Sequence, residues 1–496
     1  MRQLTALDAQ FLHAESATTA AHVAGVAILD PAWAPTGLIT RQALIELMRE
    51  RLHLAPALSL RLTGVPFGLD HPYWTEVADL DVADHIYEIT LALPGDEAQL
   101  AKEIARLHER RLDRTRPLWE MHLIQGLTGG RAALYAKVHH CAIDGVSGAD
   151  TLAALLDLTP EPRVVESPAP PPETTVPSPA AMFASAVTRS MTHPVRALRS
   201  LVRMVADLDT IPVVAALPGA RAMAAATRTI WMDSGEMPEM PSLSAPRTPF
   251  NGPISARRHF SYGSIPLADV KQVAKTFGIS VNDVVMTLCA SALRSWLHER
   301  DALPDQPLIA AIPVAVRTSS AQDTVGNQLS VMIAPMPTDL ACPLDRLRVM
   351  GKTMLTAKRR FAGSPATWLS ELSSMFPAAV TALATSTVFR LASIVLPPIN
   401  LIISNVPGPQ LPLYLCGARV LGYYPMSVLT DLSGGVNITC FSYDGSLNFG
   451  ILACPDRVED VWRLMGHLQE AMEELMELAA PAPSMEGVEG MEAVPA

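Results

Sequence analysis

The residues best suited to chemistry lie together in one segment, Lys137–Gly145, which reads KVHHCAIDG. The apolar run Ala132–Val138 predicts a buried strand, and His139 and His140 follow it directly. A glycine just beyond the pair permits a sharp turn before a predicted helix. Histidine is the natural base near neutral pH, because its unperturbed pKa is about 6.5. The segment therefore predicts a reactive histidine at the end of a strand.

The histidine pair has three possible interpretations besides a catalytic one. A lone buried histidine is usually structural, although two adjacent ones beside an Asp-Gly turn fit this less well. His140 and Asp144 are four residues apart and could share a metal, but the chain has no HExxH pattern and no further acidic or cysteine ligand at suitable spacing. A Ser-His-Asp hydrolase is disfavoured because GxSxG does not occur. We expect no metal site.

The composition limits the kinds of molecule that the protein is expected to bind. The formal net charge of −11 argues against nucleic acid, whose binding requires a basic face. Hydrophobic residues make up 49% of the chain and charged residues only 18%, so any membrane contact is expected to be hydrophobic. The six cysteines are widely spread and form no CxxC pair, which indicates reduced thiols in a cytosolic protein.

Apolar segments suited to targeting or membrane spanning are not evident in the sequence. The opening residues lack the apolar core of a secretory signal, and no clean run of about 20 apolar residues occurs. The two nearest candidates are interrupted, one by Arg390 and the other by Pro397 and Pro398. We therefore expect a cytoplasmic protein, peripherally associated with the cell membrane or lipid droplets.

The length of 496 residues predicts two domains, because a single core stops growing at about 250–300 residues. Residues 1–158 are expected to form a first α/β lobe, and residues 249–479 a second. Between them, 159–248 begins with a Pro-rich linker and continues as a helical connector, either packed on the domains or touching lipid. The last residues, 480–496, are expected to be a disordered tail.

Several elements are predicted from periodicity and turn residues. Strands are expected at His22–Asp30 and Arg257–Ser261, and helices at Glu97–Leu112 and Leu267–Phe277. An Asp-Gly pair at 444–445 separates two alternating runs and predicts a β-hairpin.

The motifs resemble a known family. HHCAIDG is similar to the HHxxxDG motif of the CoA-dependent acyltransferase superfamily, which includes chloramphenicol acetyltransferase and peptide-synthetase condensation domains. Further motifs resemble the bacterial wax ester synthase/diacylglycerol acyltransferase family, and the resemblance spans residues 4–475. These are LTALDAQFL at 4–12, Pro117-Leu118-Trp119, Asn282-Asp283, GNQ at 326–328, and SNVPGP at 404–409, which includes Ser404 and Asn405.

The resemblance implies an α/β fold of two chloramphenicol-acetyltransferase-like lobes with mixed sheets and a channel between them. It implies an O-acyltransferase that moves a long-chain acyl group from acyl-CoA to an acceptor hydroxyl. Acyl-CoA would enter the channel from one side, and the acceptor would enter from the other. Diacylglycerol would give triacylglycerol, and a long-chain fatty alcohol would give a wax ester. Acyl-CoA is a co-substrate, and no cofactor is expected.

The resemblance also implies roles for single residues. His140 would be the general base and His139 would orient its loop. Asp144 would pair with an arginine, for which Arg317 is our candidate, and Gly145 would allow the close approach of a pantetheine arm.

The other motif residues have two interpretations. Asn282, Ser404 and Asn405 are candidates to contact substrate or an oxyanion. They could instead be structural, like the PLW tryptophan packing two elements and Asp283 beginning a helix.

Two other functions stay open at this point. A member of the same superfamily could acylate a polyketide or glycolipid hydroxyl, or act on a carrier-bound substrate. A non-catalytic protein bound to lipid droplets could keep the fold, although the intact His140 speaks against that.

Overall fold

The structure is a computed structural model, and it describes residues 2–34, 37–143, 148, 151, 154–166, 178–188, 245–315, 329–363, 378–395 and 398–480. The expected tail after residue 480 and most of the expected linker and connector lie outside these residues. Asp144, Gly145, Arg317 and the GNQ motif also lie outside them. A helix spans Pro179–Thr188 within the expected connector.

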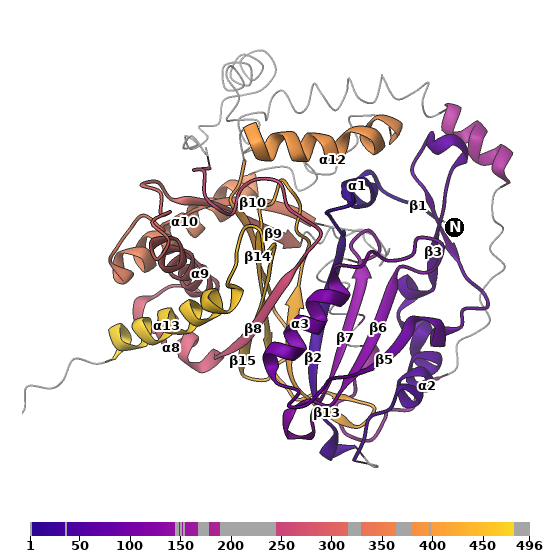
Figure 1. Cartoon of the computed structure of the whole chain (residues 1–496), viewed down its shortest axis with the longest axis horizontal. Helices are drawn as coiled ribbons and strands as arrows, with labels where there is room; N and C mark the ends of the chain where they lie inside the picture. Colours follow the sequence, from indigo (N-terminus) through magenta and orange to yellow (C-terminus); the bar gives the residue numbers. More distant parts are fainter. Residues whose placement is uncertain are drawn as a thin grey trace, which may run out of the picture.

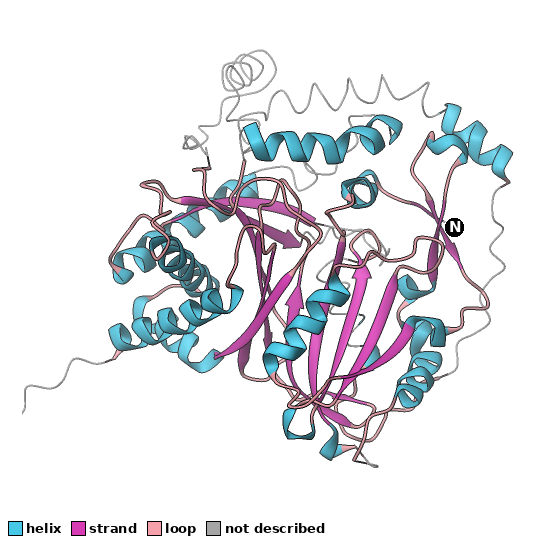
Figure 2. Ribbon diagram, in the orientation of Figure 1, coloured by secondary structure: helices cyan, strands magenta, loops and turns pink. Residues whose placement is uncertain are grey.

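The first lobe is built on a mixed sheet of six strands (Figures 1 and 2), with β2 and β7 at its centre. The strand order is β12 (Tyr414–Leu415), β13 (Ala418–Met426), β2 (His22–Asp30), β7 (Ala132–His139), β6 (Trp119–Gln125) and β5 (Ile86–Thr90). The helices of this lobe are α1 (Ala6–Ala14), α2 (Arg41–Arg51) and α3 (Glu97–His108), and a small sheet joins β1 (Arg2–Gln3), β4 (Tyr73–Glu76) and β3 (Leu60–Thr63).

The second lobe is built on another mixed sheet of six strands, and helices cover one of its faces (Figure 2). Its order is β10 (Leu329–Met336), β9 (Leu308–Ala315), β11 (Leu401–Val406), β14 (Val436–Tyr443), β15 (Ser446–Ala453) and β8 (His259–Pro266). The helices are α8 (Leu267–Phe277), α9 (Val281–His298), α10 (Pro343–Gly363), α12 (Ala378–Val395) and α13 (Val461–Ala479). The predicted α/β fold of two lobes with mixed sheets is confirmed.

The second half of the chain contributes two strands to the sheet of the first lobe. Strands β12 and β13 come from the second half of the sequence but extend the first sheet, where β13 pairs antiparallel with β2. The expected second lobe, 249–479, therefore gives 414–426 to the sheet of the first. Gly450 in β15 allows β13 to approach, because a Cβ there would lie 1.9 Å from the Pro425 carbonyl oxygen.

An apolar core crosses the boundary between the lobes. Side chains of β2 and α3 pack with Phe260 and Tyr262 of β8 and with Leu452 of β15. Arg258, buried beside this core, donates to the Thr18 carbonyl at 2.8 Å, and its backbone NH donates to Glu109. The lobes are therefore joined by apolar burial and by hydrogen bonds, which makes them one folding unit.

Most predicted elements are confirmed, with shifted ends. The bounds of β2 and α8 agree with the prediction, whereas α3 ends at His108, four residues before the predicted Leu112. The strand predicted at Arg257–Ser261 is displaced to His259–Pro266, because its partner β15 continues to Ser446 and sets the register. The hairpin is confirmed: Asp444 and Gly445 have positive φ angles of 42° and 80°, as a type I′ turn requires.

Among the described residues, no single helix has the length and apolar character needed to cross a membrane. The pair α8 and α9, bent by 103°, meets those criteria by length and composition only.

Candidate active site

His140 lies one residue beyond the end of the central strand β7. Its backbone NH donates to the Ala21 carbonyl at 2.9 Å, which continues the pairing with the segment before β2. Its imidazole is buried and stacks on the ring of Phe11, with ring centroids 4.0 Å apart and planes 5° from parallel. This face-to-face contact restricts the orientation of the imidazole.

Helix α1 supplies Phe11. The helix begins with a capping box, in which the Thr5 side chain accepts from the backbone NH of Asp8 and the Asp8 carboxylate faces the backbone NH of Thr5. Leu7 and Leu12 are buried and fix the helix on the lobe. The box sets where the helix starts, and the buried leucines set its rotation, so together they bring Phe11 against His140.

His139 lies against Glu15, the residue that follows α1. His139 Nδ1 accepts from the backbone NH of Cys141 at 3.1 Å, so the proton of the neutral ring is on Nε2, which faces Glu15 Oε1 at 3.4 Å. Glu15 Oε1 also accepts from Ala21 NH, and its Oε2 accepts from Arg114 at 2.6 Å. His139 thus contacts the turn that carries His140 on one side and a fixed carboxylate on the other.

The charges around Glu15 explain its pKa. Burial alone would raise the pKa of this carboxyl, but His139 and Arg114 outweigh burial and lower the pKa to about 2. Burial lowers the pKa of His139, and the attraction of Glu15 does not cancel that effect. The pair is therefore a neutral imidazole beside an ionised carboxylate at neutral pH.

The PLW residues, Pro117-Leu118-Trp119, lie at the start of β6, next to the strand that carries the histidines. The Leu118 carbonyl accepts from the backbone NH of His139 at 2.9 Å, and Leu118 packs with Cys141 and Ala142 of the turn. Trp119 is almost completely buried and donates from Nε1 to the Leu58 carbonyl at 2.8 Å. These contacts support the packing interpretation of the motif, including Pro117, which is also buried.

The Asn-Asp and SNVPGP motifs meet in the second lobe. Asn405, at the end of β11, donates from Nδ2 to Asn282 Oδ1 at 3.0 Å, in the first turn of α9. Asp283 forms a capping box with Ser280 and therefore begins α9, as the structural interpretation of this residue predicts. Ser404, half-buried in β11, pairs with Thr439 of β14.

The predicted site residues therefore fall into two groups. The first group lies at the end of β7 and consists of His139, His140 and the PLW residues. The second group lies in the other lobe, where Asn405 donates a hydrogen bond to Asn282. Asp144, Gly145 and Arg317 lie outside the described residues. Within the described residues, no cluster of three or more His, Cys, Asp or Glu side chains could hold a metal ion.

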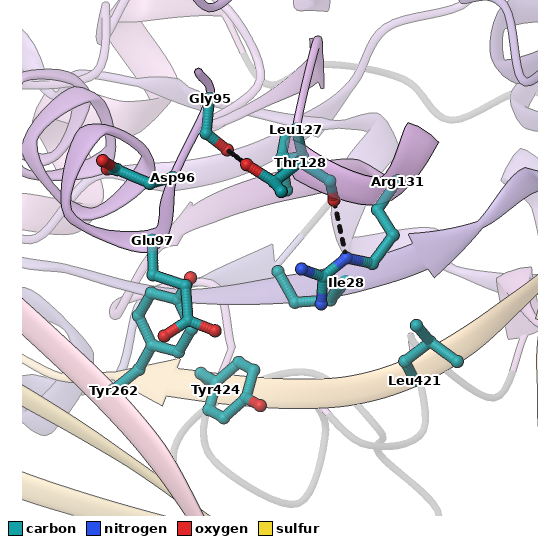
Figure 3. A pocket seen from close by; sticks show the side chains of 10 residues that line it. All are labelled: Ile28, Gly95, Asp96, Glu97, Leu127, Thr128, Arg131, Tyr262, Leu421 and Tyr424. Carbon is teal, nitrogen blue, oxygen red and sulfur yellow. Dashed lines mark hydrogen bonds between the residues drawn. The ribbon is translucent and has the colours of Figure 1, made fainter. Parts of the chain in front are cut away.

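A pocket of about 400 Å³ lies where the lobes meet (Figure 3). Tyr262 and Tyr424, from the second half of the chain, line it together with Glu97 and Arg131 from the first half. Its remaining lining residues include Ile28, which is six residues along β2 from His22, the residue paired with His139. At about 3.3 Å per residue this places the pocket roughly 20 Å from the histidines. The expected channel past His140 stays a prediction.

Phe11 and Glu15 are contacts of the histidines that the motifs do not reveal. Both belong to the opening segment, which resembles the family but contains no catalytic side-chain pattern. The Thr5–Asp8 spacing is a helix-start signal that could have predicted α1. Which residue that helix presents to His140 depends on tertiary packing.

Comparison with known proteins agrees with the motifs. A model of the wax ester synthase/diacylglycerol acyltransferase catalytic domain matches residues 4–285, and a model of the C-terminal domain of that family matches residues 325–476. A Mycobacterium tuberculosis (H37Rv) protein named as a putative diacylglycerol O-acyltransferase is 34% identical over 494 residues, covering 97% of this chain and 92% of its own. A Mycobacterium bovis protein of the same name is 32% identical, covering 94% and 97%.

Solved structures show the same relationship. The wax ester synthase/diacylglycerol acyltransferase from Marinobacter aquaeolei VT8 is 28% identical, with a TM-score of 0.65, covering 96% of this chain and 99% of its own. A mutant starter condensation domain of rhizomide synthetase, 13% identical with a TM-score of 0.50, covers 97% and 95% and shares the fold. The chain belongs to the wax ester synthase/diacylglycerol acyltransferase family.

Proposed function

We propose that this enzyme transfers a long-chain acyl group from acyl-CoA to the hydroxyl of diacylglycerol, a long-chain fatty alcohol, or both. The observation that carries the proposal is the arrangement of the paired histidines. His140 follows a central strand and stacks on Phe11, and His139 faces the carboxylate of Glu15. Family membership and the names of the relatives support the reaction and the diacylglycerol acceptor.

His140 acts as the general base in this mechanism. It removes the proton from the acceptor hydroxyl while the oxygen attacks the thioester carbonyl carbon. The tetrahedral intermediate then collapses, the C–S bond breaks, and the imidazolium returns the proton to the CoA thiolate. Because both substrates are bound together, no acyl-enzyme is needed, and the rate gain comes from positioning and proton transfer. Acyl-CoA is the only small molecule the reaction requires besides the acceptor.

The remaining motif residues have supporting roles. Asp144 holds the loop through an arginine, with Arg317 as the candidate, and Gly145 leaves room for the pantetheine arm. Asn282, Ser404 and Asn405 contact substrate or the oxyanion from the second lobe. The hydrogen bond between the two asparagines restricts their side chains.

The apolar substrates imply that the enzyme works at a lipid surface. The 49% hydrophobic content supports a peripheral, hydrophobic association with the cell membrane or with lipid droplets. The net charge of −11 disfavours attachment mainly by charge.

Replacement of the base tests the mechanism. H140A should lower kcat/KM for palmitoyl-CoA and dioleoylglycerol by roughly 10²–10⁴-fold, the usual contribution of a positioned base. H259A, at an exposed histidine of β8, is the matched control and should keep wild-type turnover. Turnover by H140A at the wild-type rate, with circular dichroism unchanged, would exclude His140 as the base.

Acceptor exchange tests the substrate. Hexadecanol and dioleoylglycerol are compared with palmitoyl-CoA as donor, and the ester products are identified by mass spectrometry. No ester with either acceptor, combined with turnover of a carrier-bound acyl donor, would contradict the proposal.

A further inference from the structure

Helix α12 exposes a row of aliphatic side chains. Val388, Leu391 and Ile394 have 56%, 60% and 50% of their surface exposed, and they recur every three residues along one side of the helix. An ordinary surface helix turns such residues inward. We call these three side chains the apolar strip of α12, because exposed aliphatic residues gathered on one helix face are typical of an interaction surface.

The buried side chains of α12 that the structure describes are polar. Thr381, Thr385 and Ser393 are buried, and each hydroxyl donates to a carbonyl of the helix itself. Among the side chains of α12 that the structure describes, the buried ones therefore carry hydroxyl groups, and Val388, Leu391 and Ile394 are exposed together with Thr387. An exposed aliphatic face of this kind is suited to contact with an apolar medium.

The charges on α12 are positive. In a chain of net charge −11, residues 378–395 contain no Asp or Glu, and their one charged residue is Arg390, which is exposed. Exposed Arg247 donates to the Ile394 carbonyl at 3.0 Å, at the same end of the helix. Aliphatic side chains beside the exposed guanidinium of Arg390 complement the acyl chains and phosphates of a phospholipid leaflet.

A second exposed apolar feature involves the helix Pro179–Thr188, which Figure 1 draws near the top of the view, as it does α12. Phe183 on this helix is partly exposed, and its ring contacts Phe67, of which 88% is exposed.

The strip on α12 is connected to the histidines through α1. The two helices pack together (Figure 1), and the Thr385 hydroxyl lies 3.2 Å from Gln10 Oε1. The next residue, Phe11, stacks on His140. One helix thus separates the exposed strip from the proposed base, so a lipid-dissolved acceptor would arrive close to where it reacts.

We propose that α12 docks this enzyme on a phospholipid leaflet through Val388, Leu391 and Ile394, with Arg390 contacting phosphates. The proposal rests on the proposed function, which requires an acceptor drawn from a lipid phase. It adds the surface that makes the contact.

Vesicle binding by the full chain tests this surface. The probes are phosphatidylcholine vesicles containing phosphatidylglycerol, and binding is measured by co-flotation. The triple variant V388Q/L391Q/I394Q should partition into vesicles at least tenfold less than wild type. The matched control V349Q/L355Q replaces two exposed aliphatic residues of α10 and should partition as wild type does. Thermal unfolding must be equal in the three proteins, because the replaced side chains are exposed.

A site-resolved measurement complements flotation and does not require loss of binding. In L391W, brominated phospholipid should quench the added tryptophan fluorescence, whereas in L355W it should not. Equal partitioning of the triple variant and wild type, or equal quenching in both tryptophan variants, would overturn the proposal. A wild-type dimer that the triple variant converts to a monomer in light scattering would assign α12 to contact with a second copy and would also overturn it.

The two proposals fail separately. If the wild-type protein makes no ester from water-soluble octanoyl-CoA and hexanol, nor from palmitoyl-CoA and dioleoylglycerol, the proposed function fails whatever the flotation result. If it makes esters but the strip does not affect vesicle binding, only the docking surface fails.

Discussion

Glu15 contacts both sides of the turn that carries the histidines, because it accepts from the Ala21 amide and faces His139 Nε2. Its other oxygen accepts from Arg114, which also donates to the Leu12 carbonyl in α1. A carboxylate with this many donors is stabilised in its ionised form, which is why its pKa falls despite burial. The consequence is a pH-dependent stability that can be measured.

E15Q removes the ionised carboxylate and should therefore lower the free energy of unfolding. A carboxyl whose folded pKa is about 2, against an ordinary value of 4.5, stabilises the fold fully above about pH 4.5, and this contribution is lost as the pH falls toward 2. We expect E15Q to be less stable than wild type by about 2–3 kcal/mol at pH 7, with the difference shrinking below pH 4.5. Urea unfolding at several pH values measures this. A difference that does not change between pH 7 and pH 3 would contradict the electrostatic role.

Phe11 acts on the ring that it stacks against. F11L keeps an apolar side chain in α1 but removes the flat face, which contributes about 0.5–1.5 kcal/mol in such pairs. We expect kcat to fall roughly 2- to 10-fold with KM for acyl-CoA little changed, because His140, the proposed base, becomes less well positioned. Steady-state kinetics checks this, and F277L, at a half-buried phenylalanine of α8, is the control. An unchanged kcat in F11L would show that the stack does not orient His140.

At the scale of elements, the close approach of β13 to β15 depends on a missing side chain. Because the nearest atom to a Cβ at Gly450 is a backbone oxygen, the strands themselves would have to move apart. G450A should therefore lower the free energy of unfolding by about 3 kcal/mol, the upper range for overpacking a core. Chemical denaturation measures it, with G64A as control, since nothing lies within 4 Å of a Cβ at Gly64. Equal stability of G450A and wild type would mean that the strands adjust freely.

Local sequence predicted the central elements well, because their signals are local. The alternation around the Asp444–Gly445 turn and the apolar run of β7 depend on neighbouring residues alone, and both were confirmed. The histidine motif, too, could be placed at the end of a strand before the fold was known. Ends of elements that depend on a distant partner, such as those of β8, could not be predicted in this way.

At the scale of the whole molecule, the sequence does not indicate which sheet a strand joins. The segment Ala418–Met426 has the pattern of a strand, but nothing local directs it to β2, nearly 400 residues earlier in the chain. Glu15 and Phe11 were missed for the same reason. Their roles arise from where α1 packs, and that is decided by burial of residues from separate segments.

A chain that ends after residue 158 tests the exchange of strands between lobes. It would lack β12 and β13, leaving the backbone of β2 unpaired at the edge of the sheet, and exposed edges of this kind associate. We expect the 1–158 fragment to be insoluble or aggregated, and to be recovered in soluble form when 159–496 is co-expressed. A monomeric 1–158 fragment that unfolds cooperatively would contradict this.

The strand exchange also has a consequence during biosynthesis. β2 and β7 leave the ribosome early, whereas β13 emerges only after residue 426 has been added. At about 5–20 residues per second, the growing chain carries an incomplete sheet for roughly 15–60 seconds. Throughout that interval the nascent polypeptide presents a free hydrogen-bonding edge next to an apolar surface, so its yield in the cell should depend on chaperones that bind nascent chains.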